Sequence, residues 1–567
     1  MISKKALMQK VSASVLFLFL LLISCAKQSN QSSFQNGALA TAAPIATDIG
    51  VQVFERGGNA FDVVVAVGFA LATVHPEAGN IGGGGFALIR DGQTKEIKAL
   101  DFREKAPRAA HERMYLDSNG QVIAKLSTLG VLSAGVPGTV AGLYELWEKY
   151  GTMEWSDLVG ISVALADSGF ILDQYQSDHF KKYQESLSRF EETTRLFFPN
   201  GTPIETGERL KLPELSSTLK QIAKHGPAAF YTGDIADSIV ATMKRHGGII
   251  TRDDLKNYRT AWREPIHFKF DSLDIYSMPP PSSGGIIMGQ ILKLLEKYDF
   301  SNYSPNSIEF IHLFCESARL AYADRSEHLG DPDYYEIPDF LLNDDYLFAR
   351  ASLIKLDHAN NSAEILPGEW NNPESKQTTH FSIADKSGNM VSFTYTLNSP
   401  YGSKLAVRGC GFLLNNEMDD FAIAPGHANI YGLVGGEANK VEPDKRMLSS
   451  MSPTIVLKSE KPFLILGSPG GSEIITAVAQ TILNFTRFRL SLTASLKQPR
   501  IHHQWLPDKI QLEQNSFDIH VMQGLINMGH HIEEFKVSSE VQAVFIDKNG
   551  DMIGATDPRE RGTAGGF

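Results

Sequence analysis

The pattern of the chain changes abruptly at Thr378. Residues 355–377 form a polar segment with two prolines and few apolar residues, which predicts an exposed and mobile loop. Directly after it, residues 379–384 and 390–397 have the composition of β-strands and flank the turn-forming residues 385–389, which predicts a β-hairpin. The fold must therefore place Thr378 where a long loop enters a sheet.

The other patterns along the chain predict sheets covered by helices. A nearly all-apolar helix is expected at 59–74, and the stretch 137–351 is mostly helical. Further strands are expected at 86–90, 97–102, 266–270, 273–277, 454–457 and 463–466, and further helices at 139–150, 155–168, 213–224, 232–245, 284–297 and after residue 472. This order of helices and strands around one long loop favours a layered sandwich.

Composition and charge argue against a protein that binds nucleic acid. Hydrophobic residues make up 43% of the chain and charged residues 21%, which is ordinary for a soluble protein with a large core. The formal net charge is -12, and no dense block of lysine and arginine follows the first few residues. A nucleic-acid partner is therefore not expected.

The first residues have the features of a secretion signal. Three lysines precede an apolar run at 15–23 that is too short for a typical membrane span, and Leu22-Ile23-Ser24-Cys25 closes it. This ending resembles the bacterial lipoprotein cleavage box, so residues 1–25 are expected to be a lipoprotein-type signal with Cys25 as the lipidated residue, followed by a tether over 26–41. The alternative is an ordinary cleaved signal with a chance cysteine. The expected location is the periplasm or cell surface, with a lipid anchor as the only link to the membrane.

Little points to disulfides, metals or cofactors. Only Cys315 and Cys410 remain after Cys25, so each is expected to be an unpaired buried thiol. The histidine pairs at 502–503 and 530–531 are adjacent in sequence and cannot easily share one ion, so no metal is expected. Residues 82–85 are glycines, but no Lys-Ser/Thr follows and a strand comes next, so no phosphate loop and no cofactor are predicted.

Thr378 can be interpreted in two ways. A β-branched residue at the start of a strand needs no functional explanation. If the chain is cut before Thr378, however, its new α-amino group can act as base for its own hydroxyl, because such an amine has a pKa of roughly 7.7 to 8.0. Gly470 and Gly471 precede a helix and could supply the paired N–H donors that an oxyanion needs.

Several long motifs together resemble the gamma-glutamyltransferase (gamma-glutamyl transpeptidase) family. The resemblance runs from about residue 42 to the C-terminus. The motifs are Gly82-Gly83-Gly84-Gly85-Phe86, Asp101-Phe102-Arg103-Glu104-Lys105-Ala106-Pro107, Thr378-Thr379-His380-Phe381-Ser382, Asn415-Asn416-Glu417-Met418-Asp419-Asp420-Phe421, Arg446-Met447-Leu448-Ser449-Ser450-Met451-Ser452-Pro453 and Gly467-Ser468-Pro469-Gly470-Gly471-Ser472.

The resemblance implies an α+β fold of the N-terminal-nucleophile hydrolase type, a four-layer αββα sandwich. It also implies one precursor that cuts itself between Gln377 and Thr378 into a large subunit, 42–377, and a small subunit, 378–567, which stay together as a heterodimer. The mature threonine would attack the γ-glutamyl amide of glutathione or a related compound. Water, an amino acid or a dipeptide would then release the glutamyl group.

The same resemblance implies roles for the residues around the substrate. Arg103, with Ser449 and Ser450, would hold the glutamyl α-carboxylate, and a guanidinium suits this because it can bind a carboxylate through two hydrogen bonds. Further roles are implied for Asn398, Glu417 and Asp420 as acceptors for the α-ammonium, for Thr396 as a support for the nucleophile, for Gly470 and Gly471 as the oxyanion hole, and for Tyr431, within residues 425–436, as part of a lid.

Other functions remain open at this stage. A cephalosporin or glutaryl acylase, or a relative that processes poly-γ-glutamate, would share the fold with another substrate. Ser217-Thr218-Leu219-Lys220 fits the S-x-x-K pattern of penicillin-binding proteins, although no K-T-G element follows. A non-enzymatic surface lipoprotein is the alternative outside enzymes, and it would predict damage at Thr378 or in the glycine turn.

Overall fold

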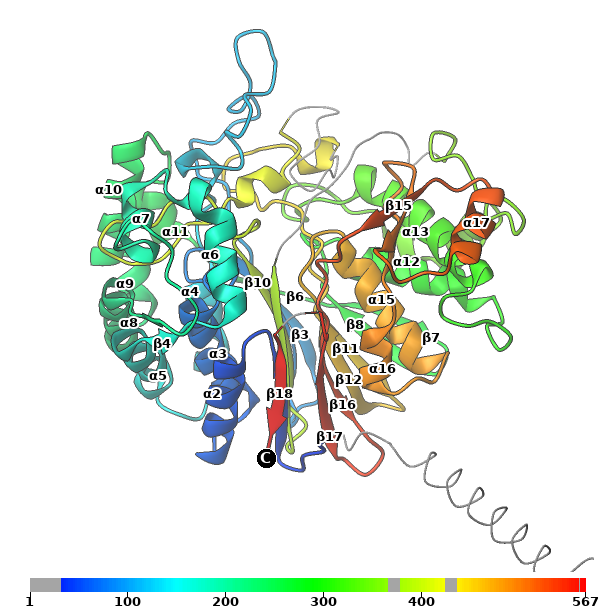
Figure 1. Ribbon diagram of the computed structural model, residues 1–567, viewed down its shortest axis with the longest axis horizontal. Coiled ribbons are helices and arrows are strands. Elements are labelled where there is room, and N and C mark those ends of the chain that lie inside the picture. Colours follow the sequence, from blue (N-terminus) through cyan, green and yellow to red (C-terminus); the bar gives the residue numbers. More distant parts are fainter. Residues whose placement is uncertain (1–31, 366–377, 424–435, 560) are drawn as a thin grey trace, which may run out of the picture. The chain divides into compact units, whose positions relative to one another are not determined.

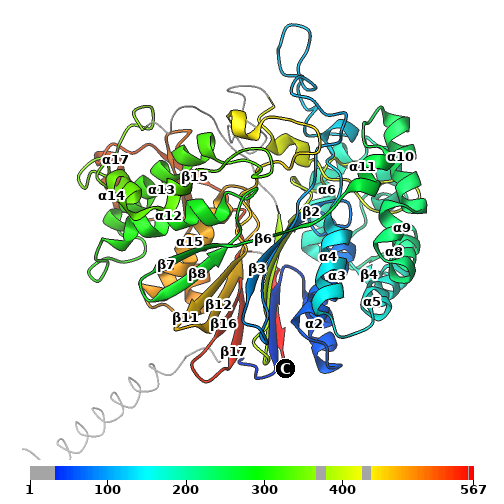
Figure 2. The ribbon, with the colours of Figure 1, turned by 180° about the vertical axis from the view of Figure 1, so that it is seen from behind.

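Two antiparallel sheets lie face to face in the computed structural model, with helices on both outer faces (Figure 1). The structure describes residues 32–365, 378–423, 436–559 and 561–567. Residues from Phe34 onward belong to one compact unit. Figure 2 shows the same layers from behind.

The first sheet contains the strand that follows Thr378. Every neighbouring pair in it is antiparallel. In spatial order its strands are β18 (Thr563–Gly566), β1 (Gly37–Thr41), β9 (Thr379–Asp385), β10 (Met390–Thr396), β2 (Gly84–Arg90), β3 (Ile97–Phe102) and β6 (Ala261–Arg263).

The second sheet packs against the first through β9, β10 and β1. Its strands, again antiparallel, are β17 (Met552–Thr556), β16 (Gln542–Ile546), β12 (Lys461–Gly467), β11 (Thr454–Lys458), β8 (Leu273–Ser277) and β7 (Ile266–Phe270). Two small sheets lie outside these layers and consist of β4 (Phe170–Ile171) with β5 (Arg209–Leu210), and of β13 (Ile501–His502), β14 (Ile510–Glu513) and β15 (Ile532–Phe535).

Each sheet has its own helical layer. The helices on the side of the first sheet are α2 (Pro44–Glu55), α3 (Ala60–Val74), α4 (Thr139–Tyr150), α5 (Trp155–Ser168), α6 (Gln174–Leu187), α7 (Glu191–Phe197), α8 (Pro213–His225), α9 (Pro227–Tyr231), α10 (Asp234–His246) and α11 (Arg252–Asn257). Those on the side of the second sheet are α12 (Gly284–Glu296), α13 (Ile308–His328), α14 (Asp344–Ala351), α15 (Glu473–Thr486), α16 (Leu492–Lys497) and α17 (Ile519–Asn527). The resulting order of layers is αββα, as predicted.

Strand β9 is buried on both faces, and its two faces differ in character. Phe381 and Ile383 point into the apolar core beneath the helices of the first sheet, because alternate residues of a strand face opposite sides. His380 faces the other sheet, where its Nδ1 lies 2.8 Å from Thr394 Oγ1. A Cβ at Gly467 would lie 2.4 Å from the His380 ring, so a glycine is needed there. Burial lowers the pKa of His380 to about 3, which keeps the imidazole neutral.

Most predicted elements form, with ends that differ by a few residues. The predicted helices at 139–150 and 155–168 have the predicted bounds, and the hairpin predicted around residues 385–389 is present. The helix predicted to begin at Thr232 begins at Asp234, and α13 extends beyond its apolar stretch to His328. The predicted unpaired burial of Cys315 and Cys410 is confirmed.

Two predicted segments need correction. The tether predicted over 26–41 cannot extend to residue 41, because Gly37–Thr41 is the buried strand β1, paired on both sides. The loop predicted from residue 355 is anchored at its described end: Trp505 Nε1 donates to the carbonyls of Ser362 and Ile365, and both residues are buried. No helix in the described ranges is both long and apolar enough to cross a bilayer.

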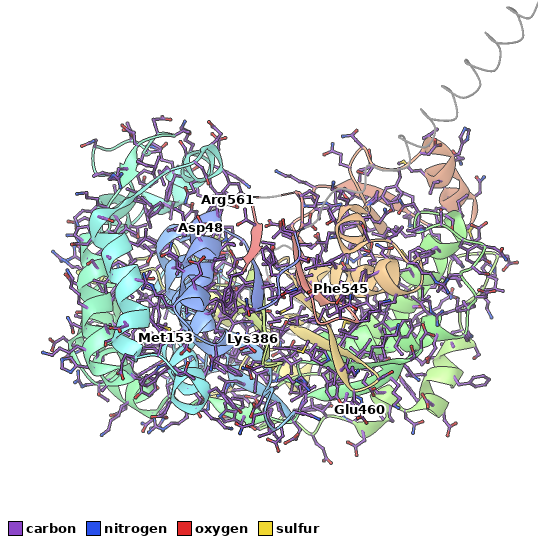
Figure 3. All side chains as sticks on the ribbon, turned by 90° about the horizontal axis from the view of Figure 1, so that it is seen from below. Asp48, Met153, Lys386, Glu460, Phe545 and Arg561 are labelled. Atoms are coloured by element: carbon purple, nitrogen blue, oxygen red, sulfur yellow. The ribbon has the colours of Figure 1, made fainter. Side chains whose placement is uncertain are left out.

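The turn between β9 and β10 ties this hairpin to helix α3. Asp385 Oδ2 accepts from the backbone N–H of Ala60 at 2.9 Å, the first residue of α3, and from Asn389 Nδ2 at 2.7 Å. Its Oδ1 accepts from the N–H of Ser387 at 2.9 Å. The neighbouring Lys386, labelled in Figure 3, is exposed. One buried carboxylate thus connects the helix to the hairpin.

We expect Asp385→Ala to lower the free energy of unfolding by about 2–3 kcal/mol, because it leaves buried N–H groups without an acceptor. Lys386→Ala, at the exposed neighbouring position, should change it by less than about 0.5 kcal/mol. Denaturant unfolding followed by fluorescence measures both. Equal effects of the two substitutions would contradict the role given to Asp385.

Candidate active site

Thr378 lies at the entrance to β9 and is 8% exposed. It lines a cavity of about 20 Å³, here called the Thr378 cavity, which has room for roughly one water molecule. The lining residues are Arg103, Arg325, Thr378, Thr396, Asn398, Glu417, Asp420, Ser449, Ser450, Met451, Gly471, Ser472 and Ile474. The structure therefore brings together all the predicted catalytic and substrate-binding residues in the described ranges, with Gly470 adjoining.

The end of β10 holds two of these residues beside Thr378. Thr396 Oγ1 accepts from the backbone N–H of Asn398 at 2.7 Å, and Asn398 adopts a left-handed conformation with φ 74°. Its side-chain amide donates to the carbonyl of Asn416 at 3.0 Å. A Cβ at Gly83 would lie 2.0 Å from the Thr396 carbonyl. The glycine run thus permits close backbone packing under the site, which explains its sequence without a phosphate.

Arg103 is the centre of a buried charge cluster. It follows β3, and its guanidinium contacts Glu417 and pairs with Asp420 Oδ2 at 2.6 Å. Both carboxylates belong to the short 3-10 helix Glu417–Asp420. Nη2 also donates to the carbonyl of Leu448 at 3.3 Å. Although burial alone would lower the pKa of Arg103, these carboxylates raise it overall, so the guanidinium stays charged.

A third carboxyl group adjoins the cluster. Glu104 lies 3.7 Å from the Arg103 guanidinium and is completely buried. Burial raises the pKa of Glu104 to about 8 and also raises that of Glu417, against the opposing effect of Arg103. Three carboxyl groups around one guanidinium in a buried site cannot all be ionised without a large cost in free energy, so Glu104 and Glu417 share a proton at neutral pH.

Ser449 and Ser450 are held in place by residues of the second helical layer. The carbonyl of Ser449 accepts from Ser283 Oγ at 2.7 Å, in the proline-rich turn before α12. Arg325, on α13, donates from Nε to Ser283 Oγ at 2.9 Å and from Nη2 to Ser450 Oγ at 3.1 Å. A second buried cation therefore orients the serine pair.

The glycine turn before α15 closes another side of the site. Gly470 and Gly471 have φ values of 124° and 58°, which side chains rarely permit, and a Cβ at Gly470 would lie 2.9 Å from the backbone of Ser539. No described backbone carbonyl accepts from either N–H. Ser472 fixes the end of the turn because its carbonyl accepts from Tyr322 at 2.5 Å. The turn presents N–H donors at a helix N-terminus, as an anionic centre requires.

A larger groove of about 860 Å³ meets the cavity at Thr378 and is here called the outer groove. Its walls come from α6, the segment after β10 and the segment before β16. Its described lining is more polar and charged than the core, and includes Lys125, Lys182, Arg189, Lys404 and Lys536. Thr378 is thus reached from a small charged cavity on one side and a wide groove on the other.

Some predicted residues lie outside the described part of the chain. These are Cys25, Gln377 and Tyr431. The two ends of the segment containing Tyr431 are nevertheless placed: the N–H of Ala422 donates to the carbonyl of Asn439 at 2.9 Å, and Asn439 Nδ2 donates to the carbonyl of Asp420 at 2.7 Å. The described residues on both sides of this segment are therefore joined to each other and to Asp420, which lines the Thr378 cavity.

The chain's relatives agree with this arrangement. The family model for gamma-glutamyltranspeptidase matches residues 46–567. The chain belongs to the gamma-glutamyltranspeptidase family. Its fold is accordingly that of an N-terminal-nucleophile hydrolase, as predicted.

Three known proteins illustrate the family and its fold. A glutathione hydrolase proenzyme of Escherichia coli (strain K12) is 44% identical over 93% of this chain and 90% of its own. The crystal structure of Helicobacter pylori gamma-glutamyltranspeptidase is 43% identical with a TM-score of 0.57, and the match covers 58% of this chain and 94% of that one. A cephalosporin acylase from Bacillus halodurans has a TM-score of 0.82 over 95% of this chain and 97% of its own, but at 24% identity it shows the fold alone.

The S-x-x-K alternative is not supported. Ser217 and Lys220 are both exposed on α8, and Lys220 lies 3.8 Å from Asp167. Neither lines the Thr378 cavity or the outer groove. A serine nucleophile needs a base and an enclosing site, which this surface does not provide.

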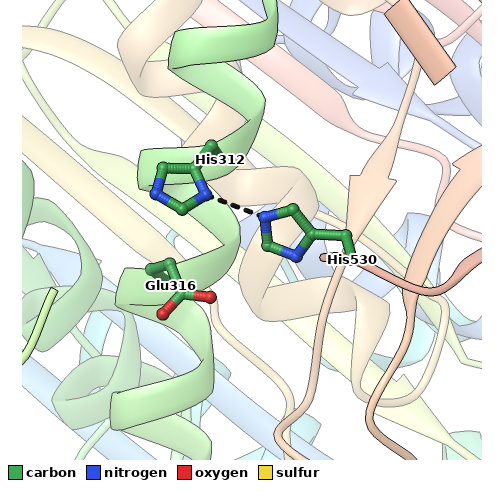
Figure 4. A group of neighbouring side chains, drawn as sticks. All are labelled: His312, Glu316 and His530. Carbon is green, nitrogen blue, oxygen red and sulfur yellow. Dashed lines mark hydrogen bonds between the residues drawn. The ribbon is translucent and has the colours of Figure 1, made fainter. Parts of the chain in front are cut away.

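A histidine cluster in the second helical layer has potential metal ligands. His312 and Glu316 lie one turn apart on α13, with His530 beside them (Figure 4). However, His312 Nδ1 is hydrogen-bonded to His530 Nε2 at 2.8 Å, and Glu316 pairs with Arg319 at 3.1 Å. These ligand atoms thus already have partners within the protein. The Arg319 guanidinium already supplies a positive charge to Glu316, the acidic residue of the cluster. We interpret the cluster as a structural link.

Two residues of this family site were missed in the sequence. Glu104 directly follows Arg103 in the sequence. An acidic residue adjacent to an arginine that is expected to bind a carboxylate indicates a candidate member of the same site. No comparable pattern in the sequence indicates a role for Arg325. It lies in the last turns of the mostly buried helix α13, 125 residues from Ser450 along the chain. Only the packing of α13 brings it to the serine pair.

The raised pKa of Glu104 predicts a pH-dependent stability. In the unfolded chain this carboxyl should lose its proton near the ordinary value of 4.5, whereas in the folded protein it does so only near 8. Its contribution to stability is therefore full below the lower value and is lost as the pH rises toward the upper one. We expect Glu104→Gln, which cannot ionise, to reduce the fall in unfolding free energy between about pH 5 and pH 8.

Denaturant titrations of the parent and the variant across this pH range measure the effect. Glu148→Gln, at an exposed position on α4, serves as the control and should follow the parent. Parallel curves for the parent and Glu104→Gln would show that Glu104 is already ionised in the folded protein.

Proposed function

We propose that the protein is a self-processing gamma-glutamyltransferase that cleaves the γ-glutamyl amide bond of glutathione and related compounds. The observation that carries this is the convergence of Thr378, the Arg103 charge cluster and the Gly470-Gly471 turn on one cavity. The name of the Escherichia coli relative, a glutathione hydrolase proenzyme, supports both the substrate and the precursor.

Maturation begins with Thr378 as an ordinary side-chain alcohol. Its Oγ attacks the carbonyl carbon of Gln377, the peptide C–N bond breaks, and the acyl group moves from nitrogen to oxygen. Water then hydrolyses this ester, which frees the hydroxyl and leaves Thr378 with an α-amino group. The products are a large subunit that ends at Gln377 and a small subunit, 378–567.

The topology supports a stable heterodimer after the cut. In the first sheet, β9 and β10 of the small subunit lie between β1 and β2 of the large subunit. In the second sheet, β11 pairs with β8 across the same division. Because backbone ladders join the two pieces in both layers, cutting the chain leaves the fold held together.

The mature threonine then acts as nucleophile with its own amine as base. The amine takes the proton from Oγ as Oγ attacks the γ-carbonyl carbon of the donor, and the N–H groups of Gly470 and Gly471 stabilise the resulting oxyanion. The proton passes to the departing amine as the C–N bond breaks. Water, an amino acid or a dipeptide resolves the glutamyl-threonine ester by the reverse sequence, with Thr396 supporting the hydroxyl.

The charge cluster accounts for recognition of the glutamyl head group. Arg103 is paired with Glu417 and Asp420, and the cavity between them is nearly filled. A zwitterionic α-amino acid group can replace this pair without changing the net charge: its carboxylate takes the guanidinium, and its ammonium takes the carboxylates. Asn398 adds an acceptor for the ammonium, while Ser449 and Ser450 add donors for the carboxylate. A glutaryl substrate lacks the free ammonium that this cluster fits.

We further propose that residues 425–436, with Tyr431, cover the bound substrate. Asn439, which follows this segment, donates to the carbonyl of Asp420 beside the cavity. We also propose export to the periplasm or cell surface with a lipid on Cys25. The lysines and the short apolar run before Cys25 support this. Residues 26–33 lie between Cys25 and the start of the folded unit at Phe34.

We expect Thr378→Ala to abolish both self-cleavage and activity. On a denaturing gel the parent should give two fragments, with Thr378 as the new N-terminus, and the variant one intact chain. Hydrolysis of a γ-glutamyl anilide should fall at least about a thousandfold, because the nucleophile and its amine are lost together. Thr378→Ser keeps a hydroxyl and should still cut. Active material with Gln377 still joined to Thr378 would refute the mechanism.

We expect Cys25→Ser to release the protein from membranes. A lipid-bearing parent should partition into detergent, and the variant into the aqueous phase, with unchanged anilide hydrolysis by processed protein. Mass spectrometry of the N-terminus gives an independent readout. An unmodified Cys25 in the parent would favour an ordinary signal.

A further inference from the structure

A buried lysine lines the outer groove, which Thr378 also lines. Lys404 is 8% exposed and occupies a tight turn after β10, with φ 65°. Its Nζ donates to Ser399 Oγ at 2.7 Å and to the carbonyl of Gly402 at 2.6 Å. Ser399 also lines the groove and directly follows Asn398, which lines the Thr378 cavity.

This ammonium has no counter-charge in the described part of the chain. No described carboxylate lies within 4.0 Å of Nζ, and two neutral oxygens account for two of its three donors. Burial lowers the pKa of Lys404 to about 7, as expected for a cation held away from water. A buried lysine without a carboxylate partner is rare unless something else supplies the charge.

The other lysines and the arginine of the outer groove differ from Lys404. Lys125, Lys182 and Lys536 are exposed, and Arg189 pairs with Glu185 at 3.1 Å on the surface of α6 and its end. Exposed cations on flexible side chains contribute little to binding. Among the lysines and the arginine that line the groove in the described ranges, Lys404 is the buried one, and its side chain is held by two hydrogen bonds.

The geometry of the substrate matches this position. With the glutamyl head group in the Thr378 cavity, the remainder of the donor must extend into the outer groove. A dipeptide beyond the scissile bond spans roughly 7 Å when extended, so its terminal carboxylate lies about two residues from Thr378. Lys404 is hydrogen-bonded to Ser399, which directly follows Asn398 of the Thr378 cavity and itself lines the outer groove. Lys404 is thus on the groove side of Thr378, where the dipeptide must extend.

We propose that Lys404 binds the terminal carboxylate of the dipeptide on the groove side of Thr378, either the departing dipeptide of the donor or an incoming dipeptide acceptor. This rests on the proposed function and extends it to the half of the substrate that the Arg103 cluster does not contact. The carboxylate supplies the missing charge and accepts the third N–H. Lys404 is accordingly a binding residue and takes no part in proton transfer.

The test compares substrates with and without that carboxylate. For the parent protein, kcat/KM for glutathione should exceed that for glutathione with its glycine carboxylate amidated by roughly tenfold or more, the usual worth of a hydrogen bond between charged groups. Lys404→Met should remove this preference, while changing kcat/KM for a γ-glutamyl anilide, which has no such carboxylate, by less than about threefold.

A second arm separates the two sources of the carboxylate. With the anilide as donor, transfer to glycylglycine and to glycylglycine amide is measured in the parent and in Lys404→Met. Loss of preference in this arm alone assigns Lys404 to the acceptor, and loss in the glutathione arm alone to the departing dipeptide. Lys182→Met, an exposed groove lysine, is the matched control and should retain both preferences.

Failure of this inference is distinguishable from failure of the proposed function. Equal kcat/KM for glutathione and its amide, together with equal transfer to the two acceptors, in an active parent would overturn the role of Lys404 and leave the enzyme intact. The same parent experiment decides the matter if Lys404→Met does not fold. A parent that cleaves no anilide after processing would instead contradict the proposed function.

Discussion

The buried contact of Arg103 with Glu417 and Asp420 joins parts of the chain that are far apart in sequence. Arg103 directly follows β3 of the first sheet, and the two acids belong to a short helix more than 300 residues later. The carbonyl of Leu448 and the Tyr258 hydroxyl, which donates to the Arg103 carbonyl, complete the connection. Removing Arg103 or either acid would leave buried charge uncompensated, so this side of the Thr378 cavity depends on all three charged groups together.

The interleaved sheets explain how such a site survives self-cleavage. Arg103 lies in the proposed large subunit, whereas Glu417 and Asp420 lie in the small one, so the ion pair crosses the boundary between them. Strand β9 would acquire a free N-terminus at Thr378 while its hydrogen bonds to β1 and β10 remain. Cutting would therefore change the chemistry of Thr378, while the strand pairs of the two sheets keep the neighbouring residues in place.

The sequence predicted the strands and the site residues for different reasons. Alternation of residue types placed β9 and β10 to within a residue or so, because both are short, regular and followed by clear turn signals. The site residues could be named because the motifs around Arg103, Glu417 and Ser449 resemble those of the gamma-glutamyltransferase family. No sequence pattern could show that these motifs meet, since meeting depends on the order of strands in two sheets.

The errors have equally specific causes. Strand β1 was assigned to a tether because Gly37–Thr41 is short and follows a polar stretch, and only its pairing with β18 and β9 identifies it as sheet. The segment before residue 365 looked mobile because its composition is polar, yet two carbonyl contacts from Trp505 fix it. Both segments are ordered by partners more than 100 residues away, beyond the reach of local patterns.

The two sides of Thr378 differ in how they treat charge. In the Thr378 cavity the cationic and anionic groups already satisfy one another, so a ligand must carry both charges to replace them without loss. In the outer groove the ammonium of Lys404 is buried and hydrogen-bonded only to neutral oxygens. A ligand with a single negative charge is therefore enough to compensate the charge of Lys404. A γ-glutamyl dipeptide has a zwitterion at one end and a carboxylate at the other. If Arg103 and Lys404 act as proposed, this asymmetry fixes which end of such a molecule enters the cavity and places the γ-amide bond at Thr378.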